Sequence, residues 1–203
     1  MIKYNIKNKL VFLSKILLIC LFLNINSTAT EKNETITFGN NDAPVKIKVF
    51  SSLTCPHCAD FHIEVIPKLL DYVNDGKVQI IFIDFPLDQA AFNASKLLHC
   101  VDNKNQMKLL DNIYENQKEW VSGTTISQIN NNLKKIVKSF GIGDVEFDAC
   151  VSNDLISDRI LNGRINAHKK YSIDSTPTVI INEKKLTGPN DFKNIKKKIE
   201  KNI

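Results

Sequence analysis

Two cysteines separated by two residues, Cys55-Pro56-His57-Cys58, have the spacing in this 203-residue chain that most directly suggests chemistry. Thiols at this spacing can close a disulfide, exchange it with another thiol or bind a soft metal. A helical apolar pattern begins at Pro56, which predicts that Cys55 precedes the first turn of a helix. There, unpaired backbone N–H groups and the helix dipole stabilise a thiolate, and Pro56 lacks the N–H that this turn would leave unpaired.

The two residues between the cysteines set the direction of the chemistry. His57 can direct a donor or a positive charge toward the sulfur of Cys55, which favours the thiolate. A more stable reduced form makes the disulfide a stronger oxidant. Cys58, one helical turn further along, is expected to be more buried and to act as the resolving thiol.

The cysteine count is typical of a protein from an oxidising compartment. Cys20 belongs to the N-terminal segment described below, and four of the five cysteines follow it. An even number favours disulfides, and the short spacing of Cys55 and Cys58 leaves Cys100 and Cys150 as the second pair. We interpret this second pair as a structural disulfide, with a second redox relay as the alternative.

Metal binding is the competing interpretation of the Cys-x-x-Cys. A closed zinc site needs a second pair of ligands, and the sequence has no second Cys-x-x-Cys. Two thiolates would suit Cu(I), which also favours methionine ligands. The chain has only two methionines, one of them Met1, so no methionine cluster accompanies the cysteines. His62 and His99 are interpreted as surface or packing residues, because no acid or ligand spacing surrounds them in the sequence. We therefore expect no metal and no cofactor.

Residues 1–29 have the pattern of a secretory signal peptide. They contain four lysines, no acid and the apolar run Leu10–Leu23, followed by the small residues Ser27-Thr28-Ala29 at the expected cleavage site. The unbroken stretch Ile16–Leu23 is shorter than the roughly 20 residues of a membrane span, so an uncleaved anchor is only the alternative. Without this segment the chain has 23 basic and 22 acidic side chains, and its net charge of +5 therefore indicates no nucleic-acid partner.

The hydrophobic pattern predicts a βαβ unit around the cysteines. Residues 45–50 alternate apolar and polar side chains, as in a half-buried strand. Residues 78–85 are nearly all apolar, as in a strand covered on both faces. Between them, a helical period begins at Pro56 and ends at Asp75-Gly76, with a kink or a break expected at Pro67.

The character of the chain changes after the second strand. Residues 88–170 have helical periodicity and no convincing strand. The expected helices are 88–101, 105–118, 125–140, 144–152 and 153–170. A strand at 178–182, a tight turn at Asn182-Glu183, an antiparallel return and a helix at 190–201 complete the chain, and a first strand is expected near Ile36.

A second candidate site element, Ser175-Thr176-Pro177-Thr178, precedes the apolar strand that follows the helical region. A proline removes a ladder hydrogen bond and therefore belongs at the start of a strand. If the Thr176–Pro177 bond is cis, the chain turns sharply and the backbone of Thr176 is free to pair with a peptide.

Together these two elements resemble the thioredoxin superfamily. The Pro-His dipeptide and the helical block between the elements are similar to the DsbA family of exported thiol–disulfide oxidoreductases. The resemblance implies an α/β thioredoxin fold with an inserted all-helical subdomain. Its expected divisions are a signal peptide at 1–29, a thioredoxin domain at 30–86 and 154–203, and a helical insert at 87–153.

The resemblance also implies the activity and its partners. Cys55 would form a mixed disulfide with the substrate, which Cys58 or the substrate's second thiol resolves. Pro56 and His57 would tune this pair, and Thr176-Pro177 would contact the substrate. The substrates would be reduced exported proteins in the periplasm, and a DsbB-like membrane quinone reductase would reoxidise a monomeric enzyme.

Two departures from the family pattern affect this interpretation. Thr176 stands where the best-known member has valine and is similar to DsbC-type isomerases, so an isomerase or reductase is the alternative to an oxidase. The segment between Ala29 and Ile36 leaves no room for the dimerisation domain of those isomerases, which favours the oxidase. Val49 stands where some members bury an acid, so the sequence names no residue that transfers protons to Cys58.

Overall fold

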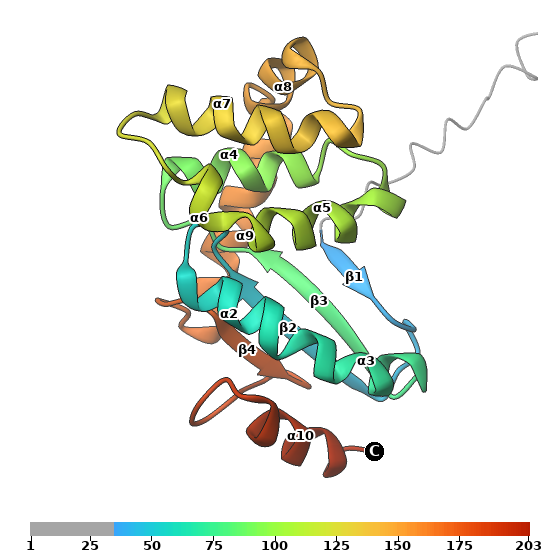
Figure 1. Ribbon diagram of the computed structural model, residues 1–203. Helices are drawn as coiled ribbons and strands as arrows, with labels where there is room; N and C mark the ends of the chain where they lie inside the picture. The colour runs from blue at the N-terminus through green and yellow to red at the C-terminus, as the bar shows by residue number, and fades with distance from the viewer. Residues whose placement is uncertain (1–34) are drawn as a thin grey trace, which may run out of the picture. The chain divides into compact units, whose positions relative to one another are not determined.

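The computed structural model describes residues 35–203, which form a five-stranded mixed sheet with helices on both faces (Figure 1). The expected signal peptide at 1–29 lies outside these residues. Across the sheet the strands follow the order β1-β3-β2-β4-β5, in which β2 and β3 are parallel and the other neighbours antiparallel. The strands are β1 Ile36–Phe38, β2 Val45–Ser51, β3 Val78–Asp84, β4 Thr178–Ile181 and β5 Lys184–Lys185. The expected α/β class is confirmed.

The central strand β2 forms as its side-chain pattern predicts. Val45, Ile47 and Val49 are at most 1% exposed, whereas Lys46 and Lys48 between them are only half-buried. Complete burial of such a side chain contributes about 1.5–3 kcal/mol. A shift of the register by one residue would exchange the two sets, so this alternation fixes which side of β2 faces the main core.

Different helices cover the two faces of the sheet. On one face, Val49 belongs to the main apolar cluster together with side chains of α2, α3 and α10. On the other face, Phe50 and Ile180 pack against Ala167 of α9, and Figure 1 shows α9 behind the sheet. The helices are α2 Pro56–Glu64, α3 Ile66–Asn74, α4 Gln89–Leu98, α5 Asn103–Glu115, α6 Gln117–Trp120, α7 Ile126–Val137, α8 Asp144–Val151, α9 Asp154–Tyr171 and α10 Phe192–Glu200.

The crossover between β2 and β3 is a helix that breaks near Pro67, as expected. α2 ends at Glu64, and Val65, whose N–H donates to the carbonyl of Phe61 at 3.0 Å, separates it from α3. Pro67 then lies in the first turn of α3, where the missing N–H removes no hydrogen bond. In an unbroken helix its ring would clash with the carbonyl of Ile63.

Residues 88–171 are mainly helical, as predicted, with one correction. The expected helix 105–118 is wrong, because α5 ends at Glu115 and the separate single-turn helix α6 follows. A hydrogen bond between the two helices fixes the position of α6, because the indole Nε1 of Trp120 donates to the carbonyl of Ile113 in α5 at 2.8 Å. Within residues 35–203, no helix is long and apolar enough to cross a membrane.

The C-terminal hairpin follows the expected pattern. Asn182 and Glu183 both have positive φ, at 44° and 66°, which suits a two-residue turn between antiparallel strands. β5 consists of two exposed lysines that pair with Ile180 and Ile181 of β4. α10 then returns across the main core through Ile195 and Ile199.

Cys100 and Cys150 form a disulfide in the helical block. Cys100 lies just after α4, Cys150 lies in α8, and the two are 50 residues apart in the sequence. A cross-link of this span removes chain entropy from the unfolded state, which stabilises the folded block.

We predict that replacing both Cys100 and Cys150 by alanine lowers the free energy of unfolding by about 2–4 kcal/mol, because the unfolded chain regains the freedom of this loop. Thiol–disulfide exchange at Cys55 should keep its rate. Denaturant unfolding and an exchange assay on the same samples measure both quantities. Lost exchange with unchanged stability would indicate a second redox relay instead.

Candidate active site

The fold places the two cysteines of the motif in different surroundings. Cys55 caps the N-terminus of α2, where its carbonyl accepts from the N–H groups of Cys58 at 3.0 Å and Ala59 at 3.2 Å. Pro56 is the first helical residue, as its missing N–H favours. Cys55 is half-buried, whereas Cys58, one turn further along, is 1% exposed. A substrate can therefore reach the first sulfur but not the second.

The segment before β4 meets the exposed cysteine. The Thr176–Pro177 bond is cis, and the Sγ of Cys55 donates to the carbonyl of Thr176 at 3.4 Å. The antiparallel pairing of β2 with β4 causes this contact, because Phe50 near the end of β2 lies opposite Thr178 at the start of β4. The two elements that the sequence singled out thus lie together.

Burial, together with the negative charge that Cys55 can carry, raises the pKa of the Cys58 thiol to about 12. The hydroxyl of Thr176 and the backbone N–H of Ser52 act in the opposite direction and lower this pKa. At neutral pH the reduced Cys58 is therefore a thiol. It must lose a proton before it can attack, and it must gain one after it leaves a disulfide.

His57 points away from the protein. Its side chain is 85% exposed, and its Nδ1 lies 3.9 Å from a carboxylate oxygen of Asp60, one turn along α2. The structure therefore places His57 on the rim of the site, in solvent. The carboxylate of Asp60 is the charged group paired with this ring.

Gln117 is a site residue that sequence reasoning missed. It is 5% exposed, and its Nε2 donates to the carbonyl of Leu53 at 2.8 Å and to that of Cys55 at 3.0 Å. α6 thereby holds the loop that connects β2 to α2. A glutamine among many polar residues carries no sequence signal of such a role, because its two acceptors lie more than 60 positions earlier.

His62 and His99 are packing residues, as one of the two expected alternatives had it, but the premise that no acid lies near them is wrong. His62 is 6% exposed and its Nε2 lies 2.7 Å from a carboxylate oxygen of Asp111, and His99 is 1% exposed and lies at the same distance from Asp84. Each partner comes from another element of the fold, so the spacing in the sequence could not reveal it. Val49, at 1% exposure, faces the apolar core as expected.

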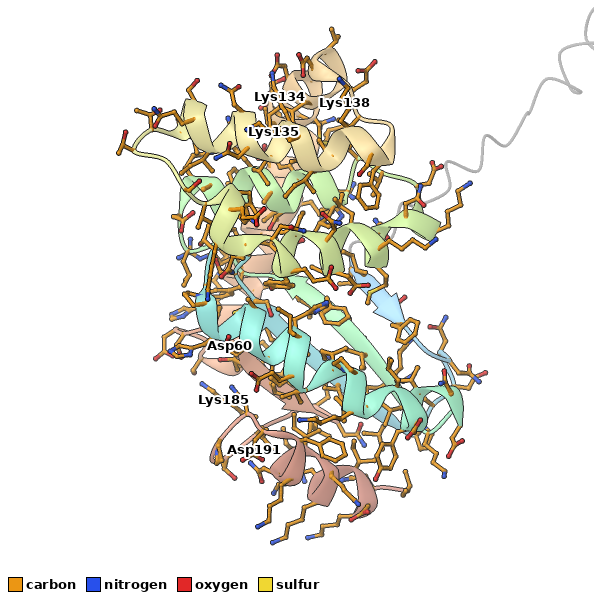
Figure 2. The ribbon with its side chains drawn as sticks, in the orientation of Figure 1. Asp60, Lys134, Lys135, Lys138, Lys185 and Asp191 are labelled. Atoms are coloured by element: carbon orange, nitrogen blue, oxygen red, sulfur yellow. A yellow bond between two sulfur atoms is a disulfide. The ribbon has the colours of Figure 1, made fainter. Side chains whose placement is uncertain are left out.

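A groove of about 410 Å³ runs beside the motif, between α2 and the segment before α10. Phe61 and Val65 provide apolar lining, and Asn190 steadies the far side, since its Nδ2 donates to the carbonyl of Pro177 at 2.7 Å. Figure 2 shows Asp60 on α2 and Asp191 before α10, the acidic residues of the two sides. The groove therefore offers an apolar floor and a carboxylate rim next to the exposed thiol.

Comparisons with known proteins agree with this geometry. A family model described as thioredoxin matches residues 31–201. A probable disulfide bond formation protein D of Bacillus cereus is 29% identical over 88% of this chain and 86% of its own length. A putative protein-disulfide oxidoreductase of Rickettsia bellii is 25% identical over 75% of this chain and 58% of its own length.

Solved structures give the same result. The crystal structure of alpha-DsbA1 from Wolbachia pipientis superposes with a TM-score of 0.73 and 26% identity, over 83% of this chain and 90% of that one. Oxidised BdbD from Bacillus subtilis gives a TM-score of 0.70 at 21% identity, over 83% and 92% of the two chains. At that identity the second similarity concerns the fold alone.

We predict that reduced, folded protein with its Cys100–Cys150 disulfide intact takes up one equivalent of iodoacetamide near pH 8, at Cys55. Cys58 should react only after denaturation, because its sulfur is buried and its pKa is about 12. Peptide mass spectrometry locates the label. Equal labelling of both thiols in the folded protein would contradict this assignment.

We predict that Gln117→Ala slows thiol–disulfide exchange and lowers the free energy of unfolding by about 1–3 kcal/mol, since the buried carbonyl of Leu53 loses its donor. Gln106→Ala is the matched control, because Gln106 is also buried and donates to a carbonyl, that of Leu98, at 3.1 Å. It should lose similar stability and keep the exchange rate. Equal slowing in both variants would show that Gln117 has no specific effect on the site.

Proposed function

We propose, since the chain belongs to the thioredoxin family and is a DsbA-like thiol–disulfide oxidoreductase, that it introduces disulfide bonds into exported proteins through Cys55 and Cys58. The observation that carries this proposal is the unequal access to the two sulfurs: Cys55 is half-buried at the start of a helix, and Cys58 is 1% exposed. This arrangement allows only one sulfur to meet a protein substrate.

The proposed reaction begins with the disulfide between Cys55 and Cys58. A substrate thiolate attacks the Sγ of Cys55, a mixed disulfide forms, and Cys58 leaves as a thiolate that takes up a proton. The substrate's second thiol loses its proton and attacks the substrate sulfur of the mixed disulfide. Cys55 then leaves as a thiolate, the substrate has lost two electrons, and the Cys55–Cys58 pair has gained them.

The position of Cys55 favours oxidation of the substrate over its reduction. A helix N-terminus stabilises negative charge, and a thiolate that caps it benefits from this field. Because this stabilises the reduced enzyme relative to the disulfide, the disulfide becomes a stronger oxidant. Pro56 supports the same geometry by starting the helix directly after Cys55.

The groove beside Cys55 is suited to an extended polypeptide. A peptide lying along Thr176-Pro177 can pair with the backbone of Thr176 while its side chains contact Phe61 and Val65. We propose these contacts as the substrate-binding role of Thr176 and Pro177. The substrates are then reduced proteins, and no nucleic acid or cofactor takes part.

The location and the partners complete the proposal. The basic, apolar and small-residue pattern of residues 1–29 supports export to the periplasm by a cleaved signal peptide. We propose reoxidation by a DsbB-like membrane quinone reductase, and action as a monomer. In this proposal residues 30–86 and 154–203 form the thioredoxin domain, 87–153 is the helical insert, and Cys100–Cys150 is a structural staple.

The second candidate function, a disulfide isomerase or reductase, rests on Thr176. Its hydroxyl lowers the pKa of Cys58 against the effect of burial. A Cys58 that deprotonates more readily resolves mixed disulfides faster, which is the step that reductases and isomerases depend on.

The reduction potential of Cys55–Cys58 distinguishes an oxidase from a reductase. We predict a potential between about −180 and −120 mV by equilibration with glutathione, and an oxidised form that unfolds at a lower temperature than the reduced form. The Cys100→Ala/Cys150→Ala variant is the control, because it leaves one redox pair. A potential near −270 mV, or an oxidised form of higher melting temperature, would support a reductase and contradict the oxidase.

A further inference from the structure

Proton supply to Cys58 is a problem that the described site does not solve. The Cys58 thiol must gain a proton whenever the disulfide opens and lose one whenever it closes, but its residue is 1% exposed. Val49, in the strand before the motif, is apolar and equally buried. Direct exchange between this sulfur and bulk water is therefore blocked, and a buried polar group has to carry the proton.

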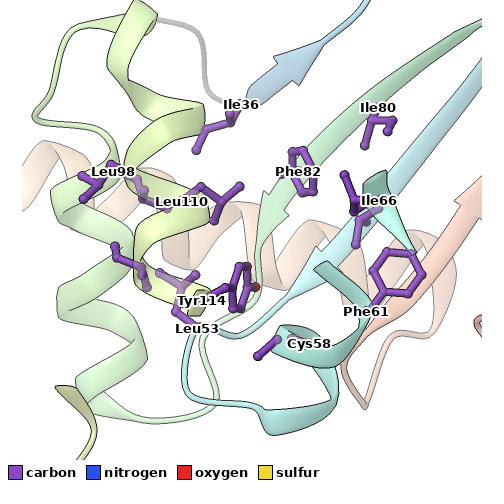
Figure 3. Packing of buried hydrophobic residues seen from close by; sticks show 14 of the residues in the cluster. Ile36, Leu53, Cys58, Phe61, Ile66, Ile80, Phe82, Leu98, Leu110 and Tyr114 are labelled. Atoms are coloured by element: carbon purple, nitrogen blue, oxygen red, sulfur yellow. The ribbon is translucent and has the colours of Figure 1, made fainter. Parts of the chain in front are cut away.

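Tyr114 of α5 is the buried hydroxyl next to this thiol. It is 2% exposed and belongs to the same apolar cluster as Cys58, and Figure 3 shows the two side chains beside each other. Its hydroxyl has no well-formed hydrogen bond to any residue that the structure describes. Burying a hydroxyl that is not fully hydrogen-bonded is unfavourable, so its presence here calls for a role.

The Tyr114 hydroxyl interacts electrostatically with both cysteines, with Asp84 and with the Ser51 side chain. Burial raises the pKa of Tyr114 well above its usual value, negative charge on Cys58, Asp84 and Cys55 raises it further, and the Ser51 side chain lowers it. Tyr114 therefore keeps its proton at neutral pH. A neutral phenol can transfer protons by donating its own proton while it accepts another.

Asp84, which acts electrostatically on Tyr114, is paired with a buried histidine. Asp84 ends β3, directly opposite Ser51 in the β2–β3 register. Its carboxylate lies 2.7 Å from the Nε2 of His99, with 16% of the Asp84 side chain and 1% of the His99 side chain exposed. An imidazole and a carboxylate in hydrogen-bond contact can share a proton and pass it on.

Asp84 also has access to water. It lines a cavity of about 250 Å³ together with Arg159, Asn162 and Asn166, which is ample room for several water molecules with polar partners. This cavity lies on the side of α9, whereas the substrate groove lies beside α2. Protons can therefore enter by a route that a bound substrate leaves open.

We propose that Tyr114 relays protons between Cys58 and the Asp84–His99 pair. When the disulfide opens, the Cys58 thiolate takes the phenol proton, the phenol takes a proton from the Asp84–His99 pair, and water in the cavity returns one to the pair. When the disulfide closes, each transfer runs in reverse. The relay rests on the thiol–disulfide exchange of the proposed function and works in either direction of that exchange.

His62 completes the surroundings of the phenol ring. Its ring lies 4.7 Å from that of Tyr114, centroid to centroid, and its Nε2 is engaged by Asp111. A ring contact of this kind orients Tyr114 but offers no path along its hydroxyl. His62 and Asp111 therefore act as positioning residues in this arrangement.

Tyr114→Phe tests the relay, because it removes the hydroxyl and keeps the ring. We expect the rates of reduction by dithiothreitol and of oxidation by oxidised glutathione to fall at least about tenfold, with a changed pH profile and solvent deuterium isotope effect. The reduction potential should not fall, and the free energy of unfolding should change little, since the polar contact that is lost is the one with the Ser51 side chain. Asp84→Asn should slow the same two reactions, and the double variant should be no slower than the slower single variant.

Tyr72→Phe on α3 is the matched control and should leave both rates unchanged. Rates and pH profile of Tyr114→Phe within twofold of the wild type would overturn the relay, as would a loss of rate that is fully explained by a shifted potential. A potential typical of a reductase would contradict the oxidase but leave this test intact, because the small-molecule reactions do not depend on the physiological direction.

Discussion

The position of β2 in the middle of the sheet is the constraint on which the site depends. Its parallel partner β3 ends at Asp84, opposite Ser51, and its antiparallel partner β4 begins at Thr178, opposite Phe50. The end of β2, the end of β3 and the start of β4 therefore meet at one edge. The parallel pairing also requires a crossover helix, and this helix starts at the same edge directly after Cys55. One hydrogen-bonding register thus gathers residues that are far apart in the chain.

The helical block contributes to the chemistry as well as to burial. Gln117 fixes the loop before α2 by two hydrogen bonds, and Tyr114 belongs to the same buried cluster as Cys58. Both residues lie at the junction of α5 and α6, the same place where the chain interrupts a longer helix. The interruption turns Gln117 and Trp120 inward, and each finds a backbone acceptor there. The insert is therefore joined to the site through one turn of helix.

The sequence predicted most of what depends on local patterns. The alternation in β2, the break before Pro67 and the helical start at Pro56 each follow from a few neighbouring residues, and the structure has them. The prediction of one continuous helix at 105–118 was wrong, because the hydrogen bonds of Gln117 and Trp120 to other parts of the fold override the helical period of the sequence.

The long-range contacts in and around the site could not be predicted for a related reason. His62 and Asp111 are 49 residues apart, and Cys55 and Gln117 are 62 apart, so no spacing rule connects them. Their proximity is a property of the packed fold. The sequence does indicate that such contacts must exist. Cys58 lies one turn into its helix, so other residues must shield its sulfur from water while it still exchanges protons.

The outermost strands have a consequence for the proposed action on unfolded exported proteins. An exposed sheet edge is a template on which another extended chain can add a strand and begin to aggregate. Here one edge is closed by β5, which is two exposed lysines long, and the other by the three-residue β1. Edge strands this short, one of them charged, provide few free backbone groups with which an extended polypeptide could pair. Under the proposed function, an unfolded substrate could then bind next to Cys55 and leave again without pairing with the sheet that positions the thiol.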